Sequence, residues 1–349
     1  MAAYRNTFLK VNTSNLKYNY DFYKDNTNKS IFAVIKANAY GMGIIEVAKI
    51  FEEYNCPYLA VATFDEALIL RKHQIKTPIL VMGYTPAKSY KIAEENDITL
   101  CALSSNWVKE LSNFDLSKKL KVHLKVNTSM NRLGHNSLKE LKSSLDLIKD
   151  KVTVEGIFTH FCCQDSSIVE ADFEKFMYLT KSLKYNFKWV HCSNSYNALN
   201  LKEKFSNAVR VGIGLYGGLL DYGLKNVASF TTEVAHIQHL AKGESVSYGS
   251  LYTAKENEII AILTVGYADG VLRSDKGSQV KINKAYYPIV GSICMDQMMV
   301  KVDKNVELYD EVELFGENIS IKEVAKRRNT IDYEVLCTVS NRVKRKYVK

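Results

Sequence analysis

Proline and long apolar runs are both scarce in this sequence. Its 349 residues include 4 prolines and 2 tryptophans, so proline marks few boundaries between elements. No segment approaches the ~20 consecutive apolar residues that a helix needs to cross a bilayer. The first six residues, Met-Ala-Ala-Tyr-Arg-Asn, lack the apolar core of a secretory signal. We therefore expect a cytoplasmic protein with no membrane partner.

Cysteines with metal-ligand spacing are absent as well. The seven cysteines are odd in number, include no Cys-x-x-Cys, and mostly lie in apolar, strand-like runs. This pattern predicts reduced, buried thiols. His236 and His239 have no further ligands near them in the sequence, so we expect no metal site.

Basic residues outnumber acidic ones, which gives a formal net charge of +9. Basic chains often bind the phosphate backbone of nucleic acids. Here the excess is spread over lysines on helix-like faces. The densest run, 342–349, reads as a short tail without a recognition motif. We therefore expect no nucleic-acid partner.

From about residue 30 to 217 the chain alternates short apolar runs with longer amphipathic stretches. The longer stretches, such as 45–54 and 137–148, place apolar residues three and four positions apart, as helices do. A strand followed by a helix, repeated eight times, predicts an α/β fold with a (β/α)8 TIM-type barrel. The eight expected strands are 31–35, 58–62, 79–82, 98–102, 122–126, 154–159, 189–192 and 209–213.

After residue 218 the pattern changes to extended runs separated by glycines and charged turns, which predicts a mainly β, antiparallel domain. Short helical pieces are expected at 321–327 and 332–339. A chain of this length suits one barrel and a second module. We assign residues 1–224 to the barrel domain and 225–349 to the C-terminal domain, with the first residues as candidates to join the latter.

The first expected strand is fully apolar and ends on Lys36, just before a turn that carries Tyr40. An ammonium at the end of a buried strand is costly. A desolvated lysine has a lowered pKa, and as a neutral amine it can attack an aldehyde, which is how pyridoxal phosphate is carried. The alternative is a lysine whose ammonium reaches solvent past the strand end.

In a barrel, the working residues lie at the carboxyl ends of the strands. This rule brings an amine, two guanidinium groups, an imidazole, a hydroxyl and a glycine-rich strand end to one mouth, a set suited to an anionic phosphate cofactor. Taken singly, Arg132 could be a surface arginine and His160 a core histidine. The residues selected by the rule are Lys36, Arg132, His160, Ser195, Arg210 and Gly212.

The stretch 212–217 also matches Gly-x-Gly-x-x-Gly, the dinucleotide fingerprint. That fingerprint opens an early βαβ unit, whereas no helix is expected after residue 217. Close backbone approach to a phosphate after the last barrel strand is the better use of these glycines.

Several motifs resemble those of the alanine racemase family over almost the whole chain. In the barrel they include Lys36-Ala-Asn-Ala-Tyr40-Gly and Asn-Arg132-Leu-Gly, and in the second domain Ser-Tyr248-Gly, Gly-Tyr267-Ala-Asp-Gly and Cys-Met295-Asp-Gln-Met. The resemblance implies a pyridoxal 5'-phosphate-dependent racemase. It would interconvert L-alanine and D-alanine for peptidoglycan and work as a head-to-tail homodimer.

The resemblance also implies roles for single residues. Lys36 would hold the cofactor and act as one catalytic base, and Tyr248 would be the base for the opposite face. Arg210 would meet the pyridine nitrogen, Arg132 the substrate carboxylate, and His160 would orient Arg210. The remaining expected site residues are Tyr40, Asn194, Ser195, Gly212 and Ile213 around the cofactor, Tyr267 and Met295 around the substrate, and Lys125 as a carboxylated lysine.

The chemistry explains the choice of two bases. Inverting a chiral carbon requires removal of a proton on one face and return of a proton on the other.

The chain departs from the family at Asn127, Ser129 and Met42, and Asn341 stands where several relatives have tyrosine. Racemisation of serine or of a broader range of amino acids is therefore an alternative, as is a non-catalytic cofactor-binding protein.

Overall fold

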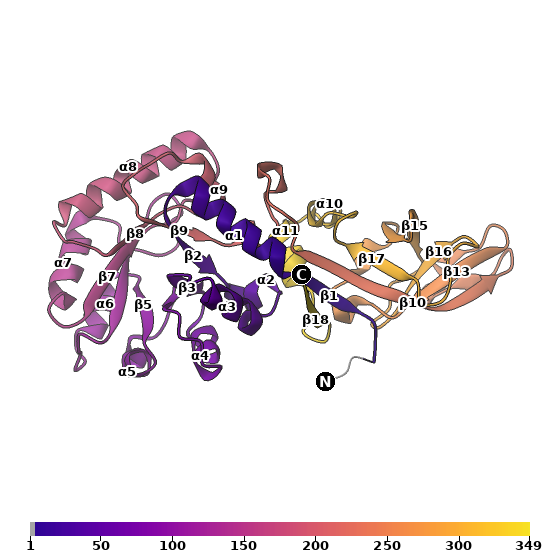
Figure 1. Ribbon diagram of the computed structural model, residues 1–349, viewed down its shortest axis with the longest axis horizontal. Coiled ribbons are helices and arrows are strands. Elements are labelled where there is room, and N and C mark those ends of the chain that lie inside the picture. Colours follow the sequence, from indigo (N-terminus) through magenta and orange to yellow (C-terminus); the bar gives the residue numbers. More distant parts are fainter. Residues whose placement is uncertain (1–3) are drawn as a thin grey trace. The chain divides into compact units, whose positions relative to one another are not determined.

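The computed structural model describes residues 4–349, which form two compact units that interleave along the chain (Figure 1). One unit comprises residues 18–39 and 43–215. The other comprises the described residues up to Lys17, a short piece at 40–42, and residues 216–349. No helix in residues 4–349 is both long and apolar enough to cross a membrane.

Eight parallel strands of the first unit close into a barrel, with β2 and β9 completing the ring. This confirms the expected TIM-type barrel, and each observed strand starts and ends within about two residues of its expected bounds. Almost all of their residues are buried, because helices cover a parallel sheet. The strands are β2 (Ser30–Val34), β3 (Tyr58–Val61), β4 (Ile79–Val81), β5 (Ile98–Ala102), β6 (Lys121–Lys125), β7 (Thr153–Phe158), β8 (Trp189–His191) and β9 (Ala208–Val211).

Helices lie around these strands in the indigo-to-magenta part of Figure 1. Their starts carry local signals: Thr63 and Glu66 form a capping box at α4, and Ser137 caps α7. The helices are α1 (Thr13–Thr27), α3 (Ile44–Glu53), α4 (Phe64–Lys72), α5 (Tyr90–Glu95), α6 (Ser105–Leu111), α7 (Leu138–Ile148), α8 (Ser166–Ser182) and α9 (Ser195–Asn200).

The second unit is built on an eight-stranded sheet in the order β13-β16-β15-β14-β17-β10-β1-β18. Its pairs are antiparallel except β1 with β18, which confirms the expected C-terminal β domain. Two short helices, α10 (Ile321–Arg327) and α11 (Asp332–Cys337), lie in the chain between the last two sheet strands, β17 and β18. Those strands are β1 (Phe8–Asn12), β10 (Ala228–Leu240), β13 (Glu258–Leu263), β14 (Gln279–Ile282), β15 (Ala285–Val290), β16 (Met298–Val302), β17 (Glu311–Phe315) and β18 (Lys344–Val348).

The interpretation of 342–349 as a tail was wrong. Residues 344–348 form β18, which pairs in parallel with β1 from Phe8↔Lys344 to Asn12↔Val348. The run looked like a tail because five of its eight residues are lysine or arginine, and in the structure it lies at the edge of the sheet. Charged residues are common there, since they discourage pairing with another chain.

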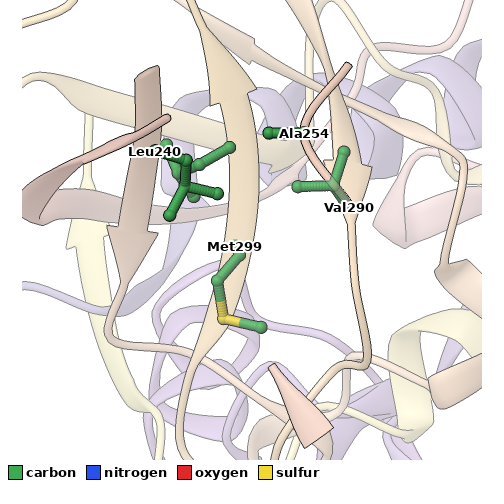
Figure 2. Close-up of a cluster of buried hydrophobic side chains, with 5 residues drawn as sticks. Leu240, Ala254, Val290 and Met299 are labelled. Atoms are coloured by element: carbon green, nitrogen blue, oxygen red, sulfur yellow. The ribbon is translucent and has the colours of Figure 1, made fainter. Parts of the chain in front are cut away.

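A compact apolar cluster supports one end of the second unit, where Leu240, Ala254, Val290 and Met299 pack together (Figure 2). Ile260 completes the cluster. Truncation of Met299 to alanine would cost about 2–5 kcal/mol, as for other buried large-to-small changes. The cluster also contacts Val246, Tyr252 and Cys294, which are near the residues expected to line the substrate pocket.

All seven cysteines are free thiols. The expectation that most are buried was wrong: Cys56, Cys101 and Cys192 are buried, whereas Cys162 and Cys337 are exposed. Cys162 lies in the loop after β7, not in the strand.

Candidate active site

The barrel mouth gathers positive charge around one imidazole. His160 lies just after β7, and its pKa falls well below the usual value. Burial is the main cause, followed by the charges of four cations: Arg210, Lys125, Arg132 and Lys36. These cations come from the ends of three strands, β2 (Lys36), β6 (Lys125 and Arg132) and β9 (Arg210), and they act together on His160. Such a set attracts anions.

Lys36 begins a turn with an unusual backbone. The next four residues are all non-glycine, yet their φ angles are positive, at 52°, 55°, 53° and 53° for Ala37, Asn38, Ala39 and Tyr40. The left-handed conformation costs L-residues roughly 1–2 kcal/mol each. Backbone strain of this kind persists only where surrounding contacts hold it, and it is concentrated at functional sites.

Two side-chain hydrogen bonds hold this turn, one from Glu66 and one from Asn38. The Ala37 N–H donates to Glu66 Oε1 at 2.6 Å, while Glu66 Oε2 accepts from the Ala62 N–H at 2.9 Å. The Ile44 N–H donates to Asn38 Oδ1 at 2.8 Å. The cap of helix α4 therefore also fixes the backbone that follows Lys36.

Arg210 is 3% exposed and is held on several sides. Its Nη1 donates to Nδ1 and to the carbonyl of His191, at 2.7 and 3.0 Å. Its Nη2 donates to the carbonyls of Thr159 and Cys192, at 2.6 and 3.0 Å, and lies 3.3 Å from His160 Nδ1. All five contacts use Nη1 or Nη2, so Nε takes part in none of them.

Ser195 and the glycine-rich end of β9 form a group of converging polar atoms. The hydroxyl of Ser195 accepts from the backbone N–H groups of Gly212 at 2.9 Å and Gly214 at 3.3 Å. A Cβ on Gly214 would lie 2.2 Å from Tyr23 Oη, so no larger residue fits there. Asn194 accepts two backbone N–H bonds from α9 at 3.1 Å each, which fixes the start of that helix.

Lys125, the last residue of β6, is 6% exposed. Its Nζ lies 4.3 Å from the centre of the Phe158 ring. Burial, and then the charge of Arg210, lower the pKa of Lys125 to about 7. A large share of this amine is therefore neutral near pH 7. Arg132 is exposed and makes no hydrogen bond or ion pair within residues 4–349.

The second unit carries the other expected residues. Tyr248, Met295 and Asp296 line one pocket, together with Ser247, Cys294, Gln297 and Met299. Tyr248 is 76% exposed, and its carbonyl accepts from the Ser292 hydroxyl at 3.0 Å.

Tyr267 is tied to the same pocket, because its N–H donates to the Cys294 carbonyl at 3.0 Å. A Cβ on Gly266 would lie 2.3 Å from that carbonyl, so the close approach requires glycine. The structure therefore brings Tyr248, Tyr267 and Met295 into one neighbourhood of the second unit.

Tyr40 belongs to the second unit and stacks on Tyr216, with ring centres 4.8 Å apart. Tyr333 lies 6.0 Å away on another side. Burial, and then Tyr333, raise the pKa of Tyr40, so its hydroxyl keeps its proton and can donate a hydrogen bond. Ile213, between the two glycines that contact Ser195, is buried.

Sequence reasoning missed Glu66 and the polar residues within the barrel strands. Glu66 had a readable signal, because Thr63 and Glu66 have the spacing of a capping box. His123, Glu155 and His191 lie inside otherwise apolar strands and are nearly inaccessible. Polar residues that interrupt buried strands are a signal that periodicity alone overlooks.

Comparisons with known proteins agree over the full length. The sequence model of the alanine racemase N-terminal domain matches residues 11–219, and that of the alanine racemase C-terminal domain matches 227–347. Alanine racemase 1 of Bacillus subtilis is 38% identical, over 99% of this chain and 94% of its own.

Solved structures are similar as well. Alanine racemase from Bacillus anthracis with bound L-Ala-P is 36% identical, covers 100% of this chain and 96% of its own, and superposes with a TM-score of 0.93. Histidine racemase from Leuconostoc mesenteroides is 27% identical, covers 100% of this chain and 99% of its own, and has a TM-score of 0.92.

Proposed function

The chain belongs to the alanine racemase family and interconverts L-alanine and D-alanine; we propose that Lys36 and Tyr248 carry the two proton transfers. The role of Lys36 is supported by its place beside Arg132 and Arg210, which also lower the pKa of His160, and that of Tyr248 by its exposed place in the pocket it shares with Met295. We further propose that the reaction supplies D-alanine for peptidoglycan, and that the protein works in the cytoplasm.

The residues at the barrel mouth fit pyridoxal 5'-phosphate. This group is strongly anionic, and the cations near His160 offer it balancing charge. Two backbone N–H groups, those of Gly212 and Gly214, converge at Ser195 Oγ, and packing against Tyr23 requires glycine at 214. When bound, the group supplies an aldehyde for an amine and takes up electron density from the α-carbon.

We assign the holding roles as follows. Lys36 would hold the group covalently through Nζ. The Ser195 hydroxyl, the backbone at Gly212 and Ile213, the Tyr40 hydroxyl and the nearby Asn194 would hold the phosphate.

Arg210 would face the ring nitrogen with Nε, the one guanidinium nitrogen that its other contacts leave unused. Because an arginine side chain does not give up its proton, Arg210 would leave that nitrogen unprotonated. His160, 3.3 Å from Nη2, would help to orient the guanidinium.

Arg132 would bind the substrate carboxylate. Its guanidinium is exposed and makes no hydrogen bond with any residue in 4–349, so an incoming carboxylate displaces no partner. Arginine is suited to this task because its planar fork can hold a carboxylate with two hydrogen bonds. Tyr267 and Met295 would close the substrate pocket and exclude water.

The proton steps need a base on each face of the α-carbon. Lys36 Nζ would remove or return the proton on one face, and Tyr248 Oη on the other. We propose that Tyr248 of one subunit serves the barrel of the other in a head-to-tail homodimer. Its 76% exposure, with that of Leu251 at 57% and Met295 at 53%, supports an assembly that covers this apolar surface.

Lys125 is proposed to react with carbon dioxide. The neutral amine nitrogen attacks the carbon, an N–C bond forms, a proton leaves to solvent, and a negatively charged carbamate remains. The lowered pKa of Lys125, about 7, favours the required neutral amine. The carbamate would pair with Arg132 and fix its direction.

A second candidate function differs in the range of amino acids that are racemised. The fold of this chain is shared by a protein named histidine racemase, so we keep serine or broad-specificity racemisation as an alternative. A cofactor carrier without activity is disfavoured, because it needs no second base such as Tyr248.

The deciding experiment is chiral analysis of products from a panel of L-amino acids, with pyridoxal 5'-phosphate added. D-alanine should form fastest, and Lys36→Ala should abolish both its formation and the visible absorbance of the bound cofactor. Borohydride reduction followed by peptide mapping should label Lys36. A label on another lysine, or activity in Lys36→Ala, would contradict the assignment.

A further inference from the structure

Polar side chains form a continuous chain through the barrel interior, where branched apolar residues are usual. His191 Nδ1 lies 2.7 Å from Arg210 Nη1, and His191 Nε2 lies 2.9 Å from His123 Nδ1. His123 Nε2 in turn faces Glu155 Oε2 at 3.6 Å, just beyond hydrogen-bond distance, and pairs with no other polar atom within residues 4–349. The two imidazoles are fully buried, and Glu155 is 9% exposed. The chain thus connects the barrel mouth to a carboxylate within the strands.

The chemistry of the chain determines which ring nitrogens carry protons. Arginine N–H groups only donate, so His191 Nδ1 must accept and the His191 proton lies on Nε2. That proton is donated to His123 Nδ1, which leaves the His123 proton on Nε2, facing Glu155. Burial lowers the pKa of both imidazoles, so both are neutral near pH 7. Every N–H in the chain therefore points toward Glu155.

Glu155 is well anchored as the end of this chain. Tyr58 Oη donates to Oε2 at 2.5 Å, and Lys188 Nζ donates to Oε1 at 2.9 Å. Burial by itself raises the pKa of Glu155, but the nearby His123 Nε2 and the hydrogen bonds from Tyr58 and Lys188 outweigh it and lower the pKa to about 2. Glu155 is therefore a carboxylate throughout the physiological pH range.

Gly156 in β7 leaves room for the His123 ring. A Cβ on Gly156 would lie 2.7 Å from His123 Nδ1 and Cε1, a distance that real Cβ contacts do not reach. A glycine in a strand often marks such a close approach. The His123 ring therefore has one place to lie, between Gly156 and His191.

Arg210 needs this support because its charge is buried. Within residues 4–349, all the hydrogen-bond acceptors of Arg210 are carbonyls or imidazole nitrogens, with no carboxylate among them. Buried charges are costly unless they are well paired. A negative charge that orients two imidazole dipoles strengthens the acceptor that Arg210 meets.

We propose that Glu155 and His123 are positioning residues for Arg210. Glu155 fixes the protonated nitrogen in His123 and, through it, in His191, so that a lone pair always faces Arg210 Nη1. The guanidinium is then held with Nε directed into the mouth. The effect on catalysis rests on the proposed function, whereas the arrangement of protons does not.

The first test therefore uses the protein without cofactor. Nitrogen-15 NMR of histidine-labelled protein reports which ring nitrogen is protonated. We expect His123 and His191 each to carry one proton, on Nε2, at neutral pH. A proton on Nδ1 of either ring would overturn the proposal, and this measurement needs no variant to fold.

The second test compares Glu155→Gln with Glu203→Gln. Glu203 is also a buried barrel carboxylate, paired with Lys29 rather than with the histidines. A glutamine at 155 can face His123 with either its oxygen or its NH2 group, so a second proton arrangement should become visible by NMR. In the loaded enzyme kcat should fall about tenfold, the equivalent of 1.4 kcal/mol, with KM unchanged.

Glu203→Gln should keep the wild-type NMR pattern and kcat. Equal losses in both variants, or a wild-type kcat in Glu155→Gln, would overturn the positioning role. Failure of the proposed function is distinguishable, because a protein that does not racemise alanine still reports its ring protons in the first test.

Discussion

Glu66 Oε1 accepts a hydrogen bond from the Ala37 N–H at 2.6 Å, directly after Lys36. One carboxylate thus caps α4 and also holds the first residue of the left-handed turn. The strain of that turn is localised beside the amine that we assign to the cofactor.

Glu66→Ala removes both functions. We expect a loss of about 2–3 kcal/mol in the free energy of unfolding, from a helix cap and a charge-assisted hydrogen bond. The turn should also relax, so that affinity for the cofactor falls. Denaturant unfolding and cofactor titration measure the two effects. Asp65→Ala, at an exposed neighbour, is the control, and equal losses in it would argue against a special role for Glu66.

Tyr248→Phe should produce an asymmetry between the enantiomers. The ring stays but the proton at Oη is lost, so removal of the α-proton from L-alanine should fall by about 10²–10⁴, the range for general acid–base catalysis. Exchange of the α-proton of D-alanine, served by Lys36, should survive in part. Proton NMR in deuterated water follows both reactions. Tyr252→Phe serves as the matched control, and equal loss for both enantiomers would favour a single base.

A carbamate on Lys125 should be directly visible. We expect a carbon-13 carbamate signal in wild-type protein equilibrated with labelled bicarbonate, and no such signal in Lys125→Ala. Removal of carbon dioxide should lower kcat/KM for alanine and raise it again when bicarbonate returns. A wild-type spectrum without the signal, together with activity that bicarbonate does not change, would identify an ordinary buried lysine.

A substitution at Asn341 tests whether this residue sets the preference for alanine or serine as substrate. It follows Ser340, whose N–H donates to the Asp269 carbonyl at 3.1 Å, and precedes Arg342, whose Nη2 donates to Asp296 at 2.7 Å. The loop is therefore tied next to Met295. An amide can pair with a serine hydroxyl, while an apolar pocket rejects an added hydroxyl by only about 10²-fold.

Asn341→Tyr should therefore lower kcat/KM for serine more than for alanine. Steady-state assays with both substrates give the ratio in wild type and variant. An unchanged ratio would mean that Asn341 does not contact the side chain of the substrate.

Stability should fall steeply in mild acid. Burial lowers the pKa of four histidines, at 123, 135, 160 and 191, so they stay neutral in the folded protein while the unfolded chain binds protons below about pH 6.5. The contribution of these histidines to the free energy of unfolding is complete above that pH and is lost as the pH falls below it. Each such histidine costs up to about 1.4 kcal/mol per pH unit.

Denaturant unfolding at several pH values measures this slope, and proton uptake on unfolding gives an independent count. Glu155 acts in the same direction at lower pH, because its pKa is lowered to about 2. Stability that is flat between pH 7 and 5 would contradict the neutral, buried state of these histidines.

The barrel and its mouth could be predicted because they follow from simple patterns. Apolar runs at regular spacing indicate eight strands, and residues just after strands indicate the site, as for Lys36, His160 and Ser195. A turn after Lys36 was expected, but its left-handed conformation at Ala37–Tyr40 could not be predicted, because non-glycine residues rarely adopt it. Two hydrogen bonds fix this conformation. One comes from Glu66, which is distant in the sequence, and the other joins Asn38 to Ile44.

Two other features could not be predicted from the sequence, for different reasons. The polar chain from Arg210 to Glu155 uses single residues in strands that otherwise read as apolar, and only closure of the barrel makes them neighbours. Residues 344–348 begin with three consecutive basic residues, as a solvated tail does, and only the pairing with β1 makes them a strand.

That pairing has a consequence for how the protein is made. β1 leaves the ribosome more than 300 residues before β18, and one of its edges stays open until Lys344–Val348 has been synthesised. The barrel strands, all between residues 30 and 211, can close during translation, but the sheet that holds β1 cannot be finished then. A chain that stops before Lys344 would therefore carry its defect at Phe8–Asn12, an unpaired strand edge open to aggregation.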